Sequence, residues 1–403
     1  MEGDAASGTR SPWQQPLPPA GADVAVVGGG VIGAATAYAL ARLEPAARVV
    51  LVEAGHLARG ASGRNAGFLL LGTHADYASA VDAYGREAAR RVWRFTQENL
   101  ALVQALAERV GPEALGLERR GSVLAAGSDD EAARLRRAHA LLTEDGVAAA
   151  WWDAPEAGEK TGLEAYAGAL FVPEGGALDP VRLVRALAWQ STALVLEGAA
   201  AADLRPASGG GTEIVLEGGH RLRAQRLVLA LNAYLPRLVP SLAGVVRPVR
   251  AQMLATEALP KVHLRAPVYS HEGYFYLRQR ADGRLLLGGA RHLHADEEVG
   301  YDDATTPALQ ADLEAYLARH VPAAAGVPVA RRWSGVMGFS PDGLPVLGEV
   351  PGLPEAVFAA GFTGHGMGYG VRFGFLVARR VLGHSDDASD LFDAARLEAR
   401  VRS

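Results

Sequence analysis

The 403-residue chain contains no cysteine and only two lysines, Lys160 and Lys261. Without a thiol, the protein can form no disulfide, thiolate nucleophile, iron–sulfur ligand or sulfur-linked prosthetic group. The basic charge is otherwise carried by arginine, whose guanidinium stays protonated and forms no Schiff base. Mechanisms that need a lysine imine are therefore limited to two candidate residues.

The chain also lacks a strong net charge, a secretion signal and a metal-ligand pattern. The formal net charge is -5, so nothing indicates a nucleic-acid-binding surface. Residues 24–41 carry no charge, but their three adjacent glycines favour a buried strand, turn and helix over a membrane span. Residues 1–21 lack the apolar core of a signal peptide, and we expect a disordered tail and a cytoplasmic protein. No histidine or carboxylate spacing predicts a metal site.

Apolar residues and glycine are abundant. Hydrophobic residues make up 49% of the chain, and there are 48 glycines. Such a composition is typical of a globular protein with a sizeable core. The length is sufficient for two domains, or for one large domain with an insertion.

Residues 22–53 contain the first strong motif. An apolar run predicts a strand over 24–27, an alanine-rich stretch predicts a helix over 31–43, and a second strand is expected over 48–52. This order, with a glycine-rich turn after the first strand, is that of a β-α-β unit that binds a dinucleotide.

The glycines of this turn have the spacing G-x-G-x-x-G. Gly28 allows the tight turn, Gly30 lets a pyrophosphate approach the backbone amides, and Gly33 lets helix and sheet pack closely. The positive end of the helix dipole then stabilises the anion. Glu53, twenty residues after Gly33, can accept the ribose hydroxyls and would repel a 2′-phosphate.

The loop over residues 54–68 is rich in glycine and in hydrogen-bond donors, which include Ser62, Arg64 and Asn65. In a simple nicotinamide-binding fold, such a loop has no evident task. In a protein that binds a longer dinucleotide, it can follow the second phosphate toward a redox ring. A flexible surface connection is the alternative.

A second glycine-rich motif lies near the C-terminus. A strand ends at Gly361, and glycines at 364, 366, 368 and 370 lead into a helix expected over 371–382. A helix N-terminus there would stabilise the negative charge that a reduced flavin carries at N1 and the adjacent carbonyl oxygen. A nicotinamide gains no such anion, so two glycine-rich helix starts favour FAD over NAD.

From residue 247 onward, the pattern is that of an antiparallel sheet, with strands expected at 247–257, 273–278 and 284–289. Tyr274, Tyr276 and Arg278 share one face of the second of these strands. Two phenols and a guanidinium could clamp an anionic or polar ligand. They could equally form a solvated outer face.

Together these motifs resemble the D-amino-acid-oxidase-like (DAO) family of FAD-dependent amine oxidoreductases, which includes glycine oxidase, sarcosine oxidase and γ-glutamylputrescine oxidoreductase types. The resemblance extends from residue 22 to about 385 and rests on residues 28–33 with Glu53, 60–67, 285–289, 340–345 and 361–366. It implies an α/β fold in which a Rossmann-like FAD-binding domain of the glutathione-reductase type carries an inserted substrate domain with a mixed or antiparallel sheet. The expected boundaries are 22–92, 152–246 and 331–400 for the FAD-binding domain, and 93–151 and 247–330 for the substrate domain.

The resemblance and the motifs together imply a set of site residues. We expect FAD, bound without a covalent link, to contact Gly28, Gly30, Val31, Ile32, Gly33, Glu53, Ala54, Ser62, Arg64, Asn65, Ala66, Gly67, Gly361, Thr363, Gly364, His365, Gly366 and Met367. The foremost candidates for substrate contact are Tyr276, which matches a substrate-carboxylate tyrosine of related oxidases, and Arg278. The next candidates are Tyr274, Arg291 and Trp333.

The chain departs from the family pattern in informative places. Val336 and Met337 stand in the strand where glycine and D-amino-acid oxidases carry a carboxylate-binding arginine. Gly368 and Leu286 stand near two positions at which sarcosine oxidase has lysines, one of them oxygen-activating. These departures argue against simple small amino acids as substrates and against fast reduction of oxygen.

The expected reaction is oxidation of a C–N bond in a small-molecule amine or in an amino acid by hydride transfer to flavin N5, followed by hydrolysis of the imine. Oxygen or another acceptor would then take the electrons. Two alternatives stay open: an NAD-dependent dehydrogenase, and an FAD-binding subunit without turnover.

Overall fold

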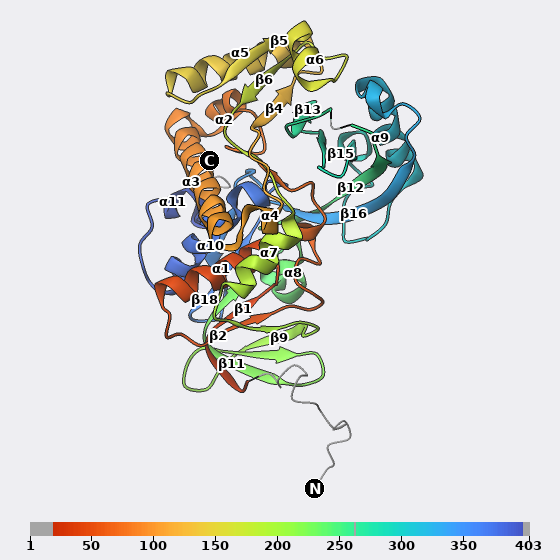
Figure 1. The fold of residues 1–403 in the computed structure, drawn as a ribbon. Helices are drawn as coiled ribbons and strands as arrows, with labels where there is room; N and C mark the ends of the chain where they lie inside the picture. The colour runs from red at the N-terminus through yellow and green to blue at the C-terminus, as the bar shows by residue number, and fades with distance from the viewer. Residues whose placement is uncertain (1–18, 262, 398–403) are drawn as a thin grey trace.

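The computed structural model describes residues 19–261 and 263–397. Most of the tail expected over 1–21 lies outside these ranges. The described residues form two eight-stranded sheets and one two-stranded sheet. Figure 1 shows the first large sheet at the bottom of the view and the second at the top, with helices between and around them.

The first sheet has the order β17-β18-β11-β1-β2-β8, and β10 and β9 extend it from β11. β1 pairs in parallel with both β2 and β11, and β18 is parallel to β11. Its strands are β1 (Gly21–Val27), β2 (Val49–Val52), β8 (Leu194–Leu196), β9 (Ala201–Pro206), β10 (Thr212–Leu216), β11 (Arg221–Leu229), β17 (Val346–Glu349) and β18 (Ala356–Ala360).

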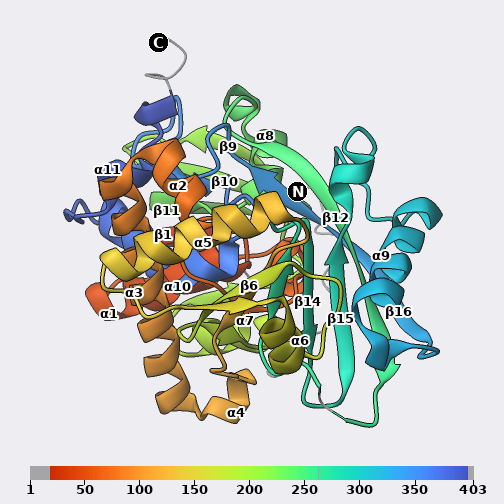
Figure 2. The same ribbon diagram turned by 90° about the horizontal axis from the view of Figure 1, so that it is seen from above.

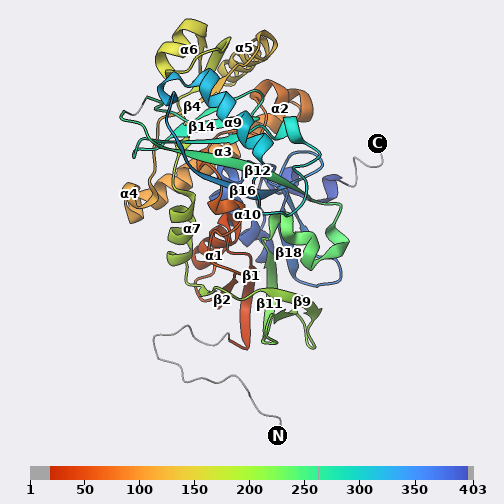
Figure 3. The ribbon, with the colours of Figure 1, turned by 90° about the vertical axis from the view of Figure 1, so that its right-hand side faces the viewer.

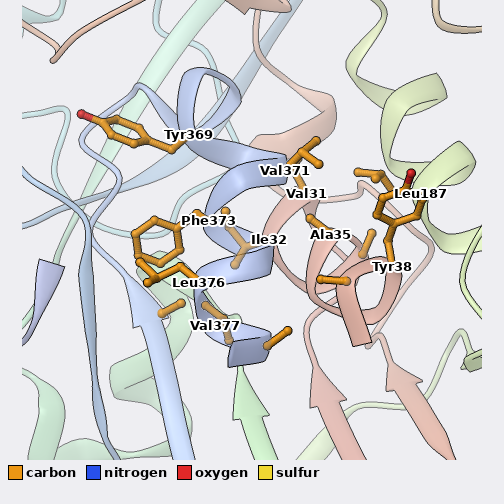
Figure 4. Packing of buried hydrophobic residues seen from close by; sticks show 14 of the residues in the cluster. Val31, Ile32, Ala35, Tyr38, Leu187, Tyr369, Val371, Phe373, Leu376 and Val377 are labelled. Atoms are coloured by element: carbon orange, nitrogen blue, oxygen red, sulfur yellow. The ribbon is translucent and has the colours of Figure 1, made fainter. Parts of the chain in front are cut away.

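Both faces of the central parallel strands β1 and β2 are buried, as parallel sheets require. Val24 and Val26 of β1 point into one apolar cluster, and Ala25 and Val27 point into another on the opposite face. The helices of the first cluster are α1 (Val31–Leu43), α3 (Arg86–Val110), α7 (Pro180–Trp189) and α10 (Gly366–Val381). Figure 4 shows side chains of α1, α7 and α10 packed in this layer.

The second sheet has the order β16-β12-β15-β14-β13-β4-β6-β5 and is antiparallel except for the parallel pair β13–β4. Its strands are β4 (Ser122–Ala125), β5 (Ala150–Asp153), β6 (Gly168–Val172), β12 (Arg247–Ala258), β13 (Val268–Ser270), β14 (Phe275–Gln279), β15 (Arg284–Gly289) and β16 (Val329–Phe339). The helices near it are α5 (Asp129–Glu144), α6 (Ala154–Thr161) and α9 (Pro307–His320). Figure 2 looks down on α5, and Figure 3 shows α9 beside β12 and β14.

Shorter elements connect the two sheets. β3 and β7 form the two-stranded sheet, and α2 leads into α3. These elements are β3 (Phe68–Leu69), β7 (Gly176–Ala177), α2 (Tyr77–Tyr84), α4 (Pro112–Leu115), α8 (Leu235–Leu238), α11 (Ser389–Phe392) and the 3₁₀ turns η1 (Ala61–Gly63), η2 (Asn232–Tyr234), η3 (Pro240–Leu242), η4 (Arg291–His294) and η5 (Pro322–Ala324). Within the described ranges, no helix is long and apolar enough to cross a membrane.

The expected fold class is confirmed, and the helix over 31–43 has the bounds read from the sequence. The last helix is a correction, because α10 begins at Gly366 and not at residue 371. The helix runs through these glycines, and two of them lie too close to neighbouring residues to carry a side chain. A Cβ on Gly368 would lie 2.7 Å from the Leu70 carbonyl oxygen, and one on Gly370 would lie 2.7 Å from Val31.

The strand expected over 273–278 is shorter in the structure and starts at Phe275. His271 and Glu272 adopt positive φ angles of 52° and 59°, which fold the preceding residues into a turn. The domain boundaries stay a prediction. β6 and β16, which fall in or across segments expected in the FAD-binding domain, hydrogen-bond within the second sheet.

Candidate active site

A cavity of about 890 Å³ lies between the helix starts of the first sheet and the second sheet. This volume is at the upper end of the range common for cofactor and ligand sites. Of the expected cofactor residues, those that line it are Gly30, Val31, Ile32, Ser62, Asn65, Ala66, Thr363, Gly364, His365, Gly366 and Met367. Gly28, Gly33, Glu53, Ala54, Arg64, Gly67 and Gly361 lie outside its lining.

The start of α1 has the geometry that the glycine spacing predicts. Gly28 adopts φ +115°, and a Cβ on Gly33 would lie 1.9 Å from the Gly28 carbonyl oxygen, so the turn tolerates only glycine there. The first-turn N–H groups have no partner inside the helix. One of them, that of Val31, donates to Ser62 Oγ at 2.9 Å. The site therefore presents backbone donors, and a hydroxyl beside them, to an anion.

Glu53 lies at the end of β2, next to this turn. Its two carboxylate oxygens accept from the backbone N–H groups of Gly29 at 2.7 Å and Gly55 at 2.8 Å. These bonds fix the carboxylate while leaving lone pairs for further donors. The contact of Glu53 with the ribose hydroxyls stays a prediction. The orientation of the carboxylate is compatible with that contact.

The loop that contains η1 is shaped by its own side chains. Asn65 Nδ2 donates to the carbonyl oxygens of Ala61 and Ser62, and its Oδ1 accepts from Gly67 N at 2.7 Å. The predicted contact of Arg64 with FAD gains no support, because its guanidinium turns away from the cavity. Its Nη1 donates to Asp303 Oδ1 at 2.6 Å and to the backbone oxygen of Ser334 at 2.8 Å.

The start of α10 forms a second backbone cradle on the same cavity. Thr363, a β-branched residue, adopts φ +46° just before it. Such strain persists only where the surroundings impose it and is concentrated at functional sites. Here Thr363 N donates to Gly338 O at 2.9 Å, and Gly361 N donates to Asn232 Oδ1 at 3.0 Å. η2 and β16 thus hold the loop in place.

His365, the residue before α10, faces Tyr269 with ring centroids 5.8 Å apart. Burial, with a smaller effect of His74, lowers the pKa of His365 to about 3. The imidazole is therefore neutral near pH 7, and the charge-stabilising donors at this end of the cavity are backbone groups and the helix dipole.

The opposite wall is built by tyrosines of the second sheet. Tyr269 of β13 and Tyr276 of β14 stand directly opposite each other, with ring centroids 5.9 Å apart. Burial raises the pKa of Tyr276 to about 12 and raises that of Tyr269 as well, so both stay neutral hydrogen-bond donors. No other described residue hydrogen-bonds to either hydroxyl. We call these two residues the phenol wall.

Arg291 lies beside the phenol wall, where η4 begins. Its guanidinium carbon is 4.9 Å from the ring centroids of both Tyr274 and Phe339. Across the described part of the chain it forms no ion pair with a carboxylate. Arg291, Tyr274 and Tyr276 all line the cavity, as expected of substrate contacts. A cation held by aromatic faces and left without a counter-ion is suited to an anionic ligand.

The prediction that Arg278 and Trp333 contact substrate gains no support, because neither residue lines the cavity. The Arg278 side chain is buried, and its Nη1 donates to the backbone oxygens of Ala66 at 3.0 Å and Leu178 at 2.9 Å. Trp333 Nε1 donates to the Arg64 backbone oxygen at 2.9 Å. Both residues tie the loop before β3 to the second sheet, so they position the cavity wall.

Several lining residues were missed from the sequence: His74, Asn232, Tyr269, Met337 and Phe339. Asn232 follows the carboxyl end of a parallel strand, where ligands bind in α/β sheets, and that signal was available. Tyr269 offered no such signal, because its place in the site depends on the pairing of β13 with β14.

A doubly covered parallel sheet, with two glycine-lined helix starts on one cavity, defines a dinucleotide-dependent redox protein. Residues 23–380 match the family model DAO, FAD dependent oxidoreductase. The chain belongs to this family, and FAD is its cofactor. The chemistry of the donors fits that cofactor, since both helix starts offer backbone N–H groups and carry a glycine at which a Cβ could not stand, Gly33 in the first and Gly368 in the second.

Individual relatives agree with this assignment. The chain is 30% identical to glycine oxidase of Geobacillus kaustophilus (strain HTA426) over 365 residues, 88% of this chain and 92% of that protein. It is 26% identical to γ-glutamylputrescine oxidoreductase of Escherichia coli (strain K12) over 377 residues, 90% of this chain and 84% of that protein.

Solved structures show the same fold. The crystal structure of glycine oxidase from Geobacillus kaustophilus matches with a TM-score of 0.79 and 28% identity over 93% of this chain and 98% of that chain. L-proline dehydrogenase from P. horikoshii matches with a TM-score of 0.79 and 22% identity over 95% of this chain and 99% of that chain, which concerns the fold alone. The NAD-dependent alternative gains no support from these comparisons.

Proposed function

We propose that this protein oxidises a C–N bond of an amine or amino acid. The observation that carries the proposal is that both glycine-rich helix starts line one cavity, next to the phenol wall. The relatives named glycine oxidase and γ-glutamylputrescine oxidoreductase point to the same class of reaction. FAD, when bound, accepts a hydride from the carbon next to the nitrogen.

The protein's own residues bind and orient the substrate. The Tyr276 hydroxyl and the Arg291 guanidinium bind an anionic or polar group of the substrate, and Tyr274 holds Arg291 through its ring face. Tyr269 adds a second phenol donor. The substrate enters with a neutral nitrogen, so no side-chain base is required. The imine product then reacts with water to give a carbonyl compound and ammonia or a smaller amine.

The remaining features of the proposal follow from the sequence. We expect FAD to be bound without a covalent link; the absence of cysteine excludes a link through sulfur, whereas a link through histidine stays open. Oxygen or another acceptor reoxidises the flavin, and the cytoplasm is the expected location. The alternative of an FAD-binding subunit without turnover gains no support, because the relatives are FAD-dependent amine or amino-acid oxidoreductases.

Anaerobic mixing with a panel of amines and amino acids tests the proposal. A substrate bleaches the oxidised flavin absorption band, whereas a subunit without turnover shows no bleaching with any compound. We expect Arg291→Met to lower the second-order rate of bleaching by a carboxylate-bearing amine about 10- to 100-fold, because a charge-assisted hydrogen bond contributes about 1.5–3 kcal/mol. Tyr276→Phe should give a smaller loss.

The matched control is Arg331→Met, which removes an exposed arginine from β16. It should leave the rate unchanged. If Arg291→Met and Tyr276→Phe both bleach at the wild-type rate, this assignment of substrate contacts is wrong even if amine oxidation is confirmed.

A further inference from the structure

The start of α10 is weak when judged by its own sequence. Its first five residues include Gly366, Gly368 and Gly370, and a glycine inside a helix lowers the stability of the helix relative to alanine. His365, at the N-cap, forms no side-chain capping bond, and no acidic residue follows it in the first turn. These local preferences favour a helix that begins near residue 371, whereas the structure begins it at Gly366. A contact from elsewhere in the chain must therefore stabilise this start.

A buried asparagine of α3 provides such a contact. α3 packs against α10 in the apolar layer that also contains α1 (Figure 1). Asn99 Nδ2 donates to the Met367 backbone oxygen at 3.1 Å, and Asn99 Oδ1 accepts from the backbone N–H of Val371 at 2.8 Å. The same oxygen accepts from the backbone N–H of Arg372 at 3.1 Å. One amide thus binds backbone groups on both sides of the point where the local preferences change.

The spacing of these backbone groups gives the contact its meaning. In a regular α-helix, the Met367 carbonyl oxygen and the Val371 N–H would be the acceptor and the donor of a single hydrogen bond. A carboxamide carries both a donor and an acceptor, so it can bind the two groups at once. Asn99 therefore joins the first turn of α10 to the body of the helix.

Asn99 acts from behind the cavity wall. Its residue is 1% exposed, and it does not line the cavity. The residues four positions before and after it on α3, Phe95 and Val103, belong to the apolar core. A polar group is costly to bury in such surroundings unless its hydrogen bonds are satisfied, and those of Asn99 are made to α10. The site of its action is therefore α10.

The turn that Asn99 supports belongs to the second backbone cradle. Gly364 and Gly366 line the cavity, the first exposed and the second half-buried. The N–H groups of a first helical turn have no partner inside the helix, and together with the helix dipole they stabilise negative charge in front of them. Their direction depends on the conformation of residues 366–370. A change in that conformation alters what the cradle offers to the cofactor.

We propose that Asn99 is a positioning residue for FAD. Its amide holds the first turn of α10 in the conformation that directs backbone N–H groups toward the redox ring. A reduced flavin carries negative charge, so these N–H groups stabilise the reduced form more than the oxidised form. Asn99 thereby raises the reduction potential through α10, without contact with the cofactor. This inference rests on FAD binding and does not depend on amine oxidation.

Redox titration tests the inference without any amine. Asn99→Leu keeps a branched side chain without the hydrogen bonds, whereas Asn99→Ala leaves a space. Both variants should bind oxidised FAD about 3- to 10-fold more weakly. Reduced FAD should lose about tenfold more affinity than oxidised FAD, which lowers the two-electron midpoint potential by about 30 mV. Titration of the FAD-loaded full-length chain against a dye of known potential measures the shift.

An unchanged or higher midpoint potential in both variants overturns the inference. A lower potential in only one of them also overturns it, because that shift would report the size of the side chain and not the lost amide.

Thr161→Val is the matched control. Thr161 is a buried polar residue of α6 that does not line the cavity, and its Oγ1 donates to the Ala157 backbone oxygen at 2.6 Å. Loss of this bond should lower stability and leave the midpoint potential unchanged. A shift as large as that of Asn99→Leu would show that general loosening of the protein is the cause, and it would overturn the inference.

Hydrogen exchange of the FAD-loaded protein localises the effect. In Asn99→Leu, the amides of residues 366–372 should exchange at least about tenfold faster, while those of residues 374–381 keep the wild-type rate. Wild-type exchange over 366–372 overturns the inference. Because none of these measurements uses an amine, their failure leaves the proposed reaction standing, and a protein without turnover can still show the role of Asn99.

Discussion

The two sides of the cavity are built in different ways. On the cofactor side, the cradle at α1 comes from residues adjacent in the chain, and its shape depends on the absence of side chains at Gly28, Gly30 and Gly33. On the substrate side, Tyr269, Tyr276 and Arg291 come from three elements, and their side chains make the surface.

The difference shows what each side can tolerate. A cradle of backbone amides is rigid and binds a fixed feature of the cofactor, so a single methyl group can block it. A wall of side chains on paired strands can change residue by residue while the sheet is kept. The cofactor side therefore identifies the family, while the substrate side can differ within it.

The largest expected effect is the loss of FAD affinity caused by a substitution on the cofactor side. In Gly33→Ala the new Cβ would lie 1.9 Å from the Gly28 carbonyl oxygen, so the turn must open. We expect FAD affinity to fall at least about 100-fold, in line with a cost of about 3 kcal/mol for severe overpacking. Quenching of FAD fluorescence by the apoprotein measures it. Gly60→Ala is the control, since nothing lies within 4 Å of that Cβ. Equal affinity in both variants would contradict the cradle.

Arg278→Met tests the connection between the two sides. It removes the donor to the Ala66 and Leu178 carbonyl oxygens and leaves them buried, which should cost about 2–4 kcal/mol of unfolding free energy. FAD affinity should fall as well, because Ala66 lines the cavity. Urea unfolding and FAD titration measure these changes. Arg280→Met, on the exposed hairpin, is the control. A variant with normal FAD affinity and altered substrate binding would restore Arg278 as a substrate contact.

The pH dependence of stability tests the burial of His365. Its pKa in the folded protein, about 3, is below the ordinary value of 6.5, so between these values the unfolded chain takes up a proton that the folded chain does not. Stability is therefore lost as the pH falls below about 6.5. Linkage gives a loss of about 2 kcal/mol from this residue between pH 7 and pH 5. Urea unfolding of His365→Gln should show a shallower dependence by that amount, and an identical dependence would mean the imidazole is not buried.

The smallest expected effect concerns Arg64, which the sequence assigned to the cofactor. Its ion pair with Asp303 is partly exposed, and such pairs contribute about 0–1 kcal/mol. Arg64→Met should therefore change stability by less than about 1 kcal/mol and FAD affinity by less than about fivefold. A loss of FAD affinity comparable to that of Gly33→Ala would show that the guanidinium reaches the cofactor. The cofactor side would then bind FAD through a side chain as well as through backbone amides.

The sequence by itself determined the β-α-β unit over residues 22–53 and the helix at 31–43, because these depend on residues close together in the chain. Two such local motifs, taken together, predicted the FAD cofactor. Short-range spacing fixes which side chains are absent from a turn and where a helix dipole begins. The same locality made the second glycine-rich motif visible, although its helix starts five residues earlier than expected.

Only the tertiary structure decided the substrate side. Whether Arg278 or Arg291 faces the cavity depends on how β14, β15 and the loop before β3 meet, and strand pairing and side-chain direction across such distances are not encoded in local spacing. Arg278 carries the charge expected of a ligand contact, yet its guanidinium donates to the backbone carbonyl oxygens of Ala66 and Leu178. The place of Tyr269 in the site became visible only when distant elements were packed together, because a cavity is a property of the space between them.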